Sequence, residues 1–268
     1  MHPMLDIAGR HVAAWGLLNA IACVVVLVGA LACSRHRAVP VFTLFRLWPW
    51  VLLGGVAGAH LYWLVAGSDV PLSRRSWAEV TDIFHGSAIQ GGFLGGGLAA
   101  LVFLRLMRTP VLATLDVIAP AGALAQAFTR VGCFLAGCCY GRPAPRVLGV
   151  VFTDRDSLGP RGVPLYPAQL VESALLVLLA AVLYARLRRR ATPVGDVFWW
   201  YVGGYGVIRF VVEFIRGDDA GRLIFGLAHS QYAALVMVAV AAAMLRRRRG
   251  DGETPARRKS TARRAVHA

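Results

Sequence analysis

The sequence predicts an all-α membrane protein of about seven transmembrane helices, with its N-terminus outside and its C-terminus in the cytoplasm. Of 268 residues, 57% are hydrophobic and only 16% are charged, whereas about 25% of the residues in a soluble domain are charged. Apolar stretches of about 20 residues recur along the chain, and an α-helix of that length crosses a hydrocarbon core of about 30 Å. Backbone amides in lipid must be hydrogen-bonded internally, so each stretch is expected to be helical.

Seven apolar stretches are the expected spans. The first carries no charge, and the third is rich in glycine, with pairs such as Gly92 and Gly96 at a spacing that lets helices pack closely. We expect residues 1–245 to form a single seven-helix transmembrane domain and residues 246–268 to form a basic, disordered cytoplasmic tail. The expected spans are Val12 to Cys33, about Leu44 to Ala66, about Ala88 to Leu106, Val111 to Phe128, about Pro167 to Leu187, Val197 to Ile215 and Ile224 to Leu245.

The arginines between these stretches predict the orientation, because cytoplasmic connections carry the excess of Lys and Arg. Basic clusters follow the first, third, fifth and seventh stretches, which places all four on one side of the membrane. The opposite connections are nearly balanced; Arg216 and Arg222, for example, are matched by Asp218 and Asp219. The N-terminus is therefore expected outside and the C-terminus inside.

Two other interpretations of the composition fit the chain less well. A net charge of +15 would suggest nucleic acid as the partner of a soluble protein, but here the charge lies between and after apolar stretches. We therefore expect membrane lipid, and no nucleic acid, as the partner. The first stretch ends in Ala30-Leu31-Ala32-Cys33, much like a lipoprotein signal. Many further spans follow it, so we interpret it as a retained helix.

One outer connection departs from the charge rule. Between the fourth and fifth stretches, arginines outnumber Asp154 and Asp156. A phosphate-bearing partner would explain the excess, since guanidinium groups match phosphate oxygens in two-point geometry. Arginines that snorkel to lipid headgroups would also explain it, and this interpretation is the one we adopt for Arg146, Arg155 and Arg161.

Arg130 and Arg142 differ from those arginines because they bracket a segment with three glycines. Gly132, Gly137 and Gly141 permit tight turns and close approach of the backbone to a ligand. Irregular backbone at membrane depth is tolerated only against protein or a wet cavity. The sequence therefore predicts that residues 130–142 form a loop lining a cavity near the outer leaflet.

The sixth stretch contributes charges to the same region. Tyr205, Arg209 and Glu213 are spaced four apart and share one helix face. Ionisable residues inside a span usually face the bundle interior and have a function, although a purely structural Arg209–Glu213 pair is the alternative. The fifth stretch adds polar residues at its start, with Gln169 and Glu172.

Taken in order, these motifs resemble the prolipoprotein diacylglyceryl transferase family. The resemblance covers about Ile83 to Met237 and rests on the glycine-rich third stretch, the block 130–142, Tyr-Pro-Ala-Gln-Leu-Val-Glu at 166–172 and Tyr-Gly-Val-Ile-Arg-Phe-Val-Val-Glu-Phe at 205–214. Enzymes of that family move the diacylglyceryl group of phosphatidylglycerol onto the thiol of a lipobox cysteine and release glycerol phosphate. The resemblance implies a bacterial inner-membrane transferase with its site toward the periplasmic leaflet. It also implies phosphatidylglycerol and a prolipoprotein signal peptide as substrates, and no cofactor or metal.

The resemblance implies roles for individual residues. Arg130 matches the family's phospholipid-binding arginine, and Arg209 and Glu213 match its essential pair. Arg130 and Arg209 would clamp the headgroup phosphate, while Glu213 orients an arginine or accepts a proton. The expected catalytic residues are Arg209, Glu213, Gln90 and His85, and the expected substrate-binding residues are Arg130, Gly132, Gly137, Tyr140, Gly141, Arg142, Gln169 and Tyr205.

The chain departs from the family pattern in ways that leave alternatives open. Gln90 replaces the family histidine proposed as thiol base, and His85 is a candidate substitute. Tyr166 replaces the histidine of the family's His-Pro-Ser-Gln motif, and Cys133 stands where many members have asparagine. A paralogue with another acceptor, or a non-enzymatic lipid-binding or transport protein, therefore stays open.

Three cysteines, Cys133, Cys138 and Cys139, lie in the same block. A free cysteine behaves as a small hydrophobe, so we interpret them as buried packing residues. A disulfide within the loop and a catalytic or metal-binding role are the alternatives, although zinc sites usually contain Cys-x2-Cys pairs.

Overall fold

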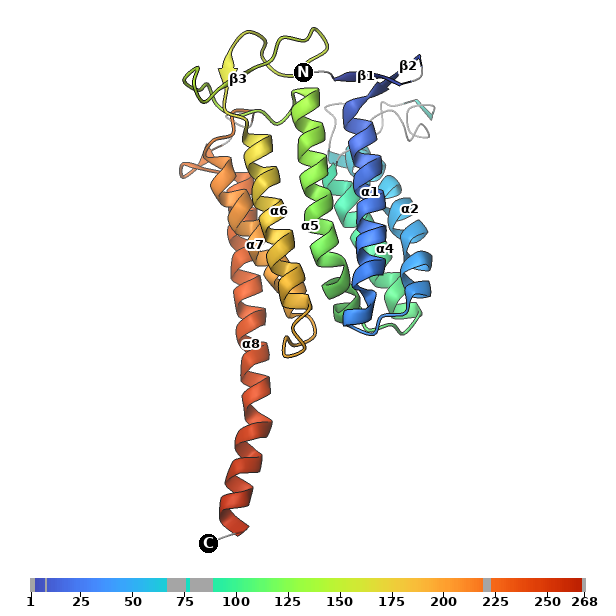
Figure 1. The fold of residues 1–268 in the computed structure, drawn as a ribbon, viewed down its shortest axis with the longest axis vertical. Coiled ribbons are helices and arrows are strands. Elements are labelled where there is room, and N and C mark those ends of the chain that lie inside the picture. The colour runs from blue at the N-terminus through green and yellow to red at the C-terminus, as the bar shows by residue number, and fades with distance from the viewer. Residues whose placement is uncertain (1–2, 8, 67–75, 78–88, 219–222, 267–268) are drawn as a thin grey trace. The chain divides into compact units, whose positions relative to one another are not determined.

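A computed structural model describes residues 3–7, 9–66, 76–77, 89–218 and 223–266. In this part of the chain the structure is dominated by seven α-helices, as the sequence predicted (Figure 1). These are α1 (Ala14–Cys33), α2 (Val41–Ala66), α4 (Ile89–Leu106), α5 (Val111–Ala136), α6 (Ala168–Leu187), α7 (Asp196–Glu213) and α8 (His229–Val266).

Each predicted span overlaps one of these helices. Among the described residues, four segments are long and apolar enough to cross a membrane: Ala14–His36, Val41–Val65, Val111–Ala136 and Ala168–Leu187. The apolar part of α4, Gly91–Leu106, is shorter. α7 is less apolar because it carries Asp196, Arg209 and Glu213 within 18 residues. α8 continues past Leu245, the expected end of the seventh span; the disorder expected for residues 246–268 stays a prediction.

Short strands also occur before α1 and in the connections between helices, which the sequence did not predict. β1 (Met4–Ile7) pairs with β2 (Arg10–Ala13), β3 (Val150–Val151) with β4 (Pro164–Leu165), and β5 (Leu223–Ile224) with β6 (Leu227–Ala228). All three pairs are antiparallel. The β3–β4 pair lies in the connection between α5 and α6, and β4 ends shortly before α6 begins.

The described helices group into two compact units. The first contains residues 1–29 and 116–268, and the second contains residues 30–115. In the second unit, α2 packs on α4 through glycines, because a Cβ at Gly58 would lie 2.7 Å from Gly95 Cα. This contact confirms the packing role predicted for glycines of the third span. The single-domain organisation expected from the sequence stays a prediction.

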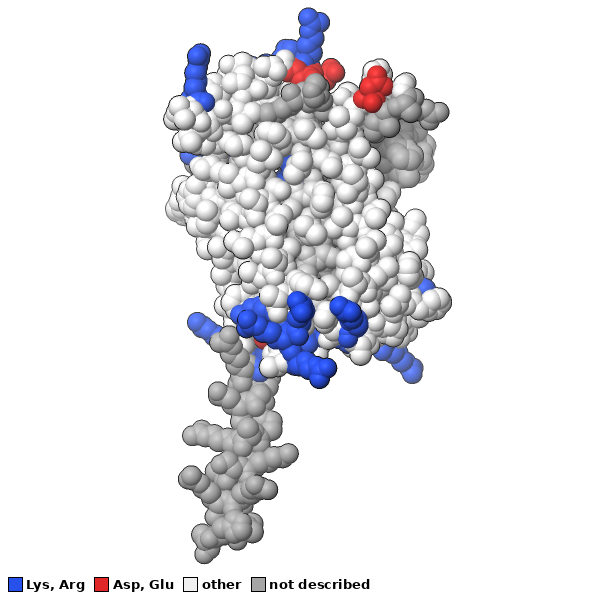
Figure 2. Space-filling model, in the orientation of Figure 1, with Lys and Arg blue, Asp and Glu red and all other residues white. Residues whose placement is uncertain are grey.

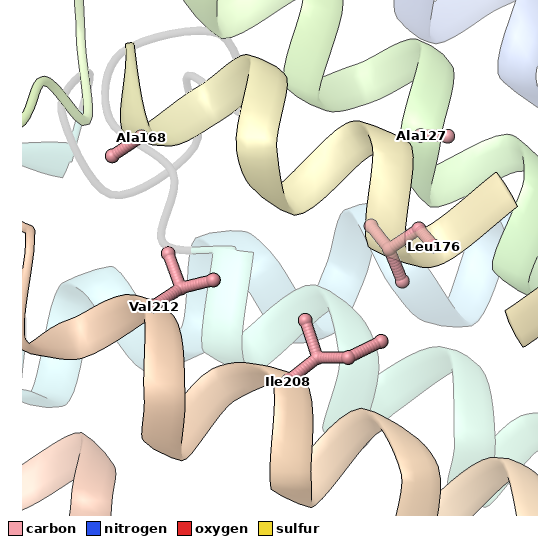
Figure 3. Close-up of a cluster of buried hydrophobic side chains, with 5 residues drawn as sticks. All are labelled: Ala127, Ala168, Leu176, Ile208 and Val212. Carbon is pink, nitrogen blue, oxygen red and sulfur yellow. The ribbon is translucent and has the colours of Figure 1, made fainter. Parts of the chain in front are cut away.

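The core of the first unit forms where α5, α6 and α7 meet. Figure 3 shows small and branched side chains of the three helices facing one another, namely Ala127, Ala168, Leu176, Ile208 and Val212. Lipid is as apolar as leucine, so this association depends on close van der Waals packing between helices. α8 joins the same unit by packing on α7, where a Cβ at Gly206 would lie 2.9 Å from Ala234 O.

A buried carboxylate fixes the start of α7 against α5. Asp116 of α5 accepts hydrogen bonds from the backbone N–H groups of Gly195, at 2.7 Å, and Phe198, at 2.9 Å. The first turn of a helix leaves its N–H groups without intrahelical partners, and a carboxylate is a preferred acceptor for them. Asp116 therefore acts as an N-terminal cap supplied by a different helix.

α5 is longer than the sequence predicted, and this corrects the expected loop at 130–142. The span was expected to end at Phe128, yet the helix continues to Ala136, so Arg130 and Gly132 are helical. Gly132 lets α1 approach, because a Cβ there would lie 3.2 Å from Leu18 Cβ. The irregular backbone begins only at Gly137, whose φ is 79°.

The basic side chains of the first unit are unevenly distributed. Arg188, Arg189 and Arg190 are exposed in the connection that follows α6. Figure 2 shows arginine side chains gathered where α6 ends. This is the end of α6 that the charge rule assigned to the cytoplasm.

Candidate active site

An ion pair between α5 and α6 lies at the centre of the candidate site. Arg130 Nε is 3.0 Å from Glu172 Oε2, and the Glu172 side chain is only 2% exposed. Arg130 also interacts electrostatically with Tyr205 of α7. Its guanidinium group therefore lies near residues of three helices. A guanidinium has five N–H donors, and the contact with Glu172 is made through Nε.

A second ion pair lies within α7, as the four-residue spacing predicted. Arg209 Nη1 is 2.7 Å from Glu213 Oε2, and the Glu213 side chain is 4% exposed. Arg216 Nε lies 3.9 Å from the same carboxylate oxygen. The same buried oxygen of Glu213 is thus the ion-pair partner of two guanidinium groups. The structural pairing that the sequence left as an alternative is present, and it lies in the same unit as Arg130.

Arg216 was not among the site residues predicted from the sequence. It is bound by Asp218 through two contacts, Nε to Oδ1 at 3.0 Å and Nη2 to Oδ2 at 2.6 Å. It also interacts electrostatically with Arg130 and with Cys139. Its position three residues after Glu213 was the available signal, because residues three apart share a helix face.

The segment after α5 connects the start of α6 with the end of α7. The buried Gln169 donates through Nε2 to Cys138 O at 2.7 Å. Gly141 N–H donates to Tyr166 O at 3.1 Å, and Gly217 N–H donates to Tyr140 O at 3.0 Å. These bonds hold the chain that follows Gly137 against both helices.

Arg142 and Gly141 both contact residues that follow α7, and Gly141 also contacts the residue Tyr166 before α6. Arg142 is exposed, and its Nε donates to Arg216 O at 3.0 Å. A Cβ at Gly141 would lie 2.7 Å from Tyr166 Cβ and 2.9 Å from Ile215 O. Only glycine therefore fits at this position, where the backbone passes between the residues that precede α6 and those that follow α7.

The three cysteines of the block converge. Their sulfur atoms all lie within 4.8 Å of one another, Cys133 is buried and Cys138 and Cys139 are half-buried. All three thiols are free. The pKa of the Cys139 thiol lies below its ordinary value because hydrogen bonds with the Cys133 and Cys138 thiols favour its thiolate, and Arg216 and Arg130 add positive charge.

The structure brings most predicted site residues into one unit. All the predicted substrate-binding residues, together with Arg209 and Glu213, belong to the first unit. Gly132 packs against α1, and Tyr205 stacks on Tyr201 with ring centroids 6.3 Å apart. Gln90 is the second residue of α4, in the second unit. His85 lies outside the described residues, so the catalytic roles of Gln90 and His85 stay predictions.

The chain is similar to known proteins over most of its length. The family model described as prolipoprotein diacylglyceryl transferase matches residues 3–247. The chain belongs to the prolipoprotein diacylglyceryl transferase family. Membership confirms the resemblance drawn from the ordered motifs, and it makes the chain a transferase.

Several members of the prolipoprotein diacylglyceryl transferase family are similar over most of their length. The phosphatidylglycerol–prolipoprotein diacylglyceryl transferase of Clostridium tetani is 32% identical over 241 residues, which are 90% of this chain and 95% of the relative. The enzyme of the same name from Nitratidesulfovibrio vulgaris is 34% identical over 78% of each chain. That from Nitrosomonas europaea is 36% identical over 73% of this chain and 68% of its own.

Proposed function

We propose that this chain transfers the diacylglyceryl group of phosphatidylglycerol to the lipobox cysteine thiol of a prolipoprotein, the first step of bacterial lipoprotein maturation. Family membership supports the reaction class, and the relatives share a name that states these two substrates. The observation that carries the proposal is the position of Arg130, which is paired with the buried Glu172 and is near Tyr205.

Arg130 is suited to bind the headgroup phosphate. Glu172 contacts Nε at 3.0 Å, and the terminal amino groups of the guanidinium form the fork that matches two phosphate oxygens. Arg209 and Arg216, which share the Glu213 carboxylate, supply further positive charge in the same unit. Fixed cations in a water-poor site stabilise negative charge that develops on a leaving phosphate.

The reaction requires a thiolate nucleophile, and the phosphate is part of the leaving group. A free thiol has a pKa of about 8.5 and must lose its proton before it attacks. The sulfur then forms a bond to the glyceryl carbon, the bond from that carbon to the phosphate oxygen breaks, and glycerol phosphate leaves with the electron pair. In this proposal Arg130 neutralises the departing phosphate, while Glu213 orients Arg209.

The proposed topology has seven spans, an outer N-terminus and a cytoplasmic C-terminus in the inner membrane. Glu172 lies in the first turns of α6, and Arg188 directly follows the last residue of that helix. At 1.5 Å per residue these two positions are separated by roughly 24 Å along the helix. If the arginines after α6 are cytoplasmic, then Arg130 and Glu172 lie toward the periplasmic leaflet.

Arg130→Ala tests the proposal in membranes supplied with phosphatidylglycerol labelled in its diacylglyceryl group and with a lipobox peptide. We expect the transfer rate to fall about 10²–10³-fold, the size of effect seen when a group that stabilises transition-state charge is removed. Arg146→Ala is the matched control, because Arg146 is an exposed arginine of the connection that follows α5. Undiminished transfer by Arg130→Ala would refute phosphate binding by this residue.

Complementation separates this function from the alternatives. Expression of the chain in a strain depleted of its own diacylglyceryl transferase should restore lipoprotein maturation. Binding of phosphatidylglycerol without rescue would instead indicate a family paralogue with another acceptor or a lipid-binding protein.

A further inference from the structure

We propose that Cys133, Cys138 and Cys139 form a binding site for one thiophilic divalent ion of the zinc class, with three thiolate ligands and a fourth coordination position for the acceptor thiol. The binding of the ion stands on the geometry of the cysteines alone. Its role in the reaction rests on the proposed function.

The end of α5 brings two of the ligands together. Gly137 has a φ of 79°, its N–H donates to Phe134 O at 3.2 Å, and the Cys138 N–H donates to Cys133 O at 3.1 Å. This pair of bonds is the Schellman motif, in which the residue after the left-handed glycine packs against the residue five positions earlier. Those two positions hold Cys138 and Cys133, so the helix end itself places their side chains in contact.

The third ligand depends on an unusual backbone conformation. Cys139 has a φ of 58°, in the left-handed region that residues with a side chain seldom adopt. Outliers of this kind are concentrated at functional sites, where the surrounding structure holds them. Here the left-handed turn brings the Cys139 sulfur within 4.8 Å of the other two.

The three sulfur atoms fit a tetrahedral ion after a small adjustment. Metal–sulfur bonds of about 2.3 Å in a tetrahedron place the sulfurs about 3.8 Å apart. The present separations of up to 4.8 Å therefore require a contraction of roughly 1 Å or less. Soft thiolates favour zinc-class ions over Mg²⁺ or Ca²⁺, and three protein ligands leave the open position that is typical of a catalytic zinc site.

The neighbours of the cluster support such a site. Gln169 holds the Cys138 carbonyl through its 2.7 Å hydrogen bond and so fixes the segment that carries two ligands. Three thiolates and a divalent ion have a net charge of −1, and Arg130 and Arg216 both interact electrostatically with Cys139. These guanidinium groups offset the negative charge of the site. Cys138 and Cys139 are half-buried, so the cluster is not sealed from a fourth ligand.

An ion at this position would supply the function of the family histidine that Gln90 replaces. A thiol that coordinates such an ion is deprotonated, and its proton passes to solvent. The bound sulfur then forms its bond to the glyceryl carbon as the carbon–oxygen bond breaks, and glycerol phosphate leaves with the electron pair. Arg130, whose charge acts on Cys133 and Cys139, would lie beside that leaving phosphate.

Cobalt(II) is the probe for this site. The full chain is purified in detergent under reducing conditions, freed of metal with a chelator, and titrated with cobalt(II) and then with zinc(II). We expect one equivalent of cobalt to give the charge-transfer absorption of thiolate coordination, and one equivalent of zinc to abolish it. The variant C133A/C138A/C139A should lose the absorption, and C23A/C33A, which removes the other two cysteines of the chain, should keep it.

The outcomes separate this inference from the proposed function. If the folded, reduced chain shows no thiolate–cobalt absorption, or forms a disulfide among the three cysteines that excludes the ion, the site is refuted. Arg130→Ala should lower the transfer rate and still bind cobalt. A C133A/C138A/C139A variant that lacks the ion and transfers at the normal rate would refute the role of the ion while the proposed function stands.

Discussion

Glu172 of α6 holds the guanidinium group of Arg130 of α5 at 3.0 Å, with the carboxylate side chain 2% exposed and the arginine side chain 18% exposed. The pair fixes one cation beside the segment that follows α5. It also explains how a charged residue is accommodated within the last turns of α5, a helix long and apolar enough to cross a membrane. Removing one partner of such a pair leaves the other charge buried without compensation.

We therefore expect Arg130→Ala to destabilise the fold as well as to lower the transfer rate. Breaking a buried pair from one side costs about 3–5 kcal/mol, whereas R130A/E172Q removes both charges. The double variant should regain most of the lost stability, measured by thermal unfolding in detergent, and should still transfer at a lowered rate. A double variant no more stable than R130A would show that the pair does not have this structural role.

Glu213→Gln should lower the catalytic efficiency more than Asp218→Asn. Glu213 contacts two guanidinium groups, Arg209 at 2.7 Å and Arg216 at 3.9 Å, whereas Asp218 contacts Arg216. Removing one partner of a buried polar pair costs about 1–3 kcal/mol, so kcat/KM should fall about 10–100-fold in Glu213→Gln. Steady-state kinetics with labelled phosphatidylglycerol measure both variants. Equal losses would contradict a shared role of the Glu213 oxygen.

Gly137→Ala should disrupt the end of α5. Gly137 has a φ of 79° and Gly162 a φ of 77°, and the left-handed conformation costs a residue with a Cβ about 1–2 kcal/mol. A Cβ at Gly137 would also meet Ser157 Oγ, whereas a Cβ at Gly162 would meet nothing within 4 Å. Gly162→Ala is thus the control for backbone strain alone. Thermal unfolding should show the larger loss for Gly137→Ala, and an equal loss would exclude a steric role for Ser157.

Asp116→Ala should release the start of α7. The carboxylate accepts from the Gly195 and Phe198 amides at 2.7 and 2.9 Å, and a hydrogen bond to a charged group contributes about 1.5–3 kcal/mol. Hydrogen exchange should accelerate at these two amides, and the unfolding temperature should fall. Asp156→Ala is the control, since Asp156 is exposed. Unchanged exchange at Phe198 would contradict the capping role of Asp116.

The positions of the helices followed from the sequence because the length of an apolar stretch is a local property. An α-helix rises 1.5 Å per residue, so stretches of about 20 apolar residues mark spans independently of how the spans pack. The Arg209–Glu213 contact was predictable for the same reason, because residues four apart in a helix are neighbours in any fold.

The end of α5 could not be placed in this way. Arg130 and Gly132 looked like loop residues, since charge and glycine are unfavourable in a span. The helix accommodates Arg130 because Glu172 neutralises its charge, and it accommodates Gly132 because α1 packs against that glycine. These partners come from other helices, and the sequence spacing between helices does not determine which faces meet.

The sequence by itself determined the membrane class, the helical segments and the family, and it predicted most of the polar residues of the candidate site. The tertiary structure decided that Arg130 meets Glu172, that Gln169 holds the Cys138 carbonyl, and that three cysteine sulfurs converge. The physical reason is that periodicity and length act within one helix. Partners between helices depend on close packing and on the conformation of a few turn residues such as Gly137 and Cys139.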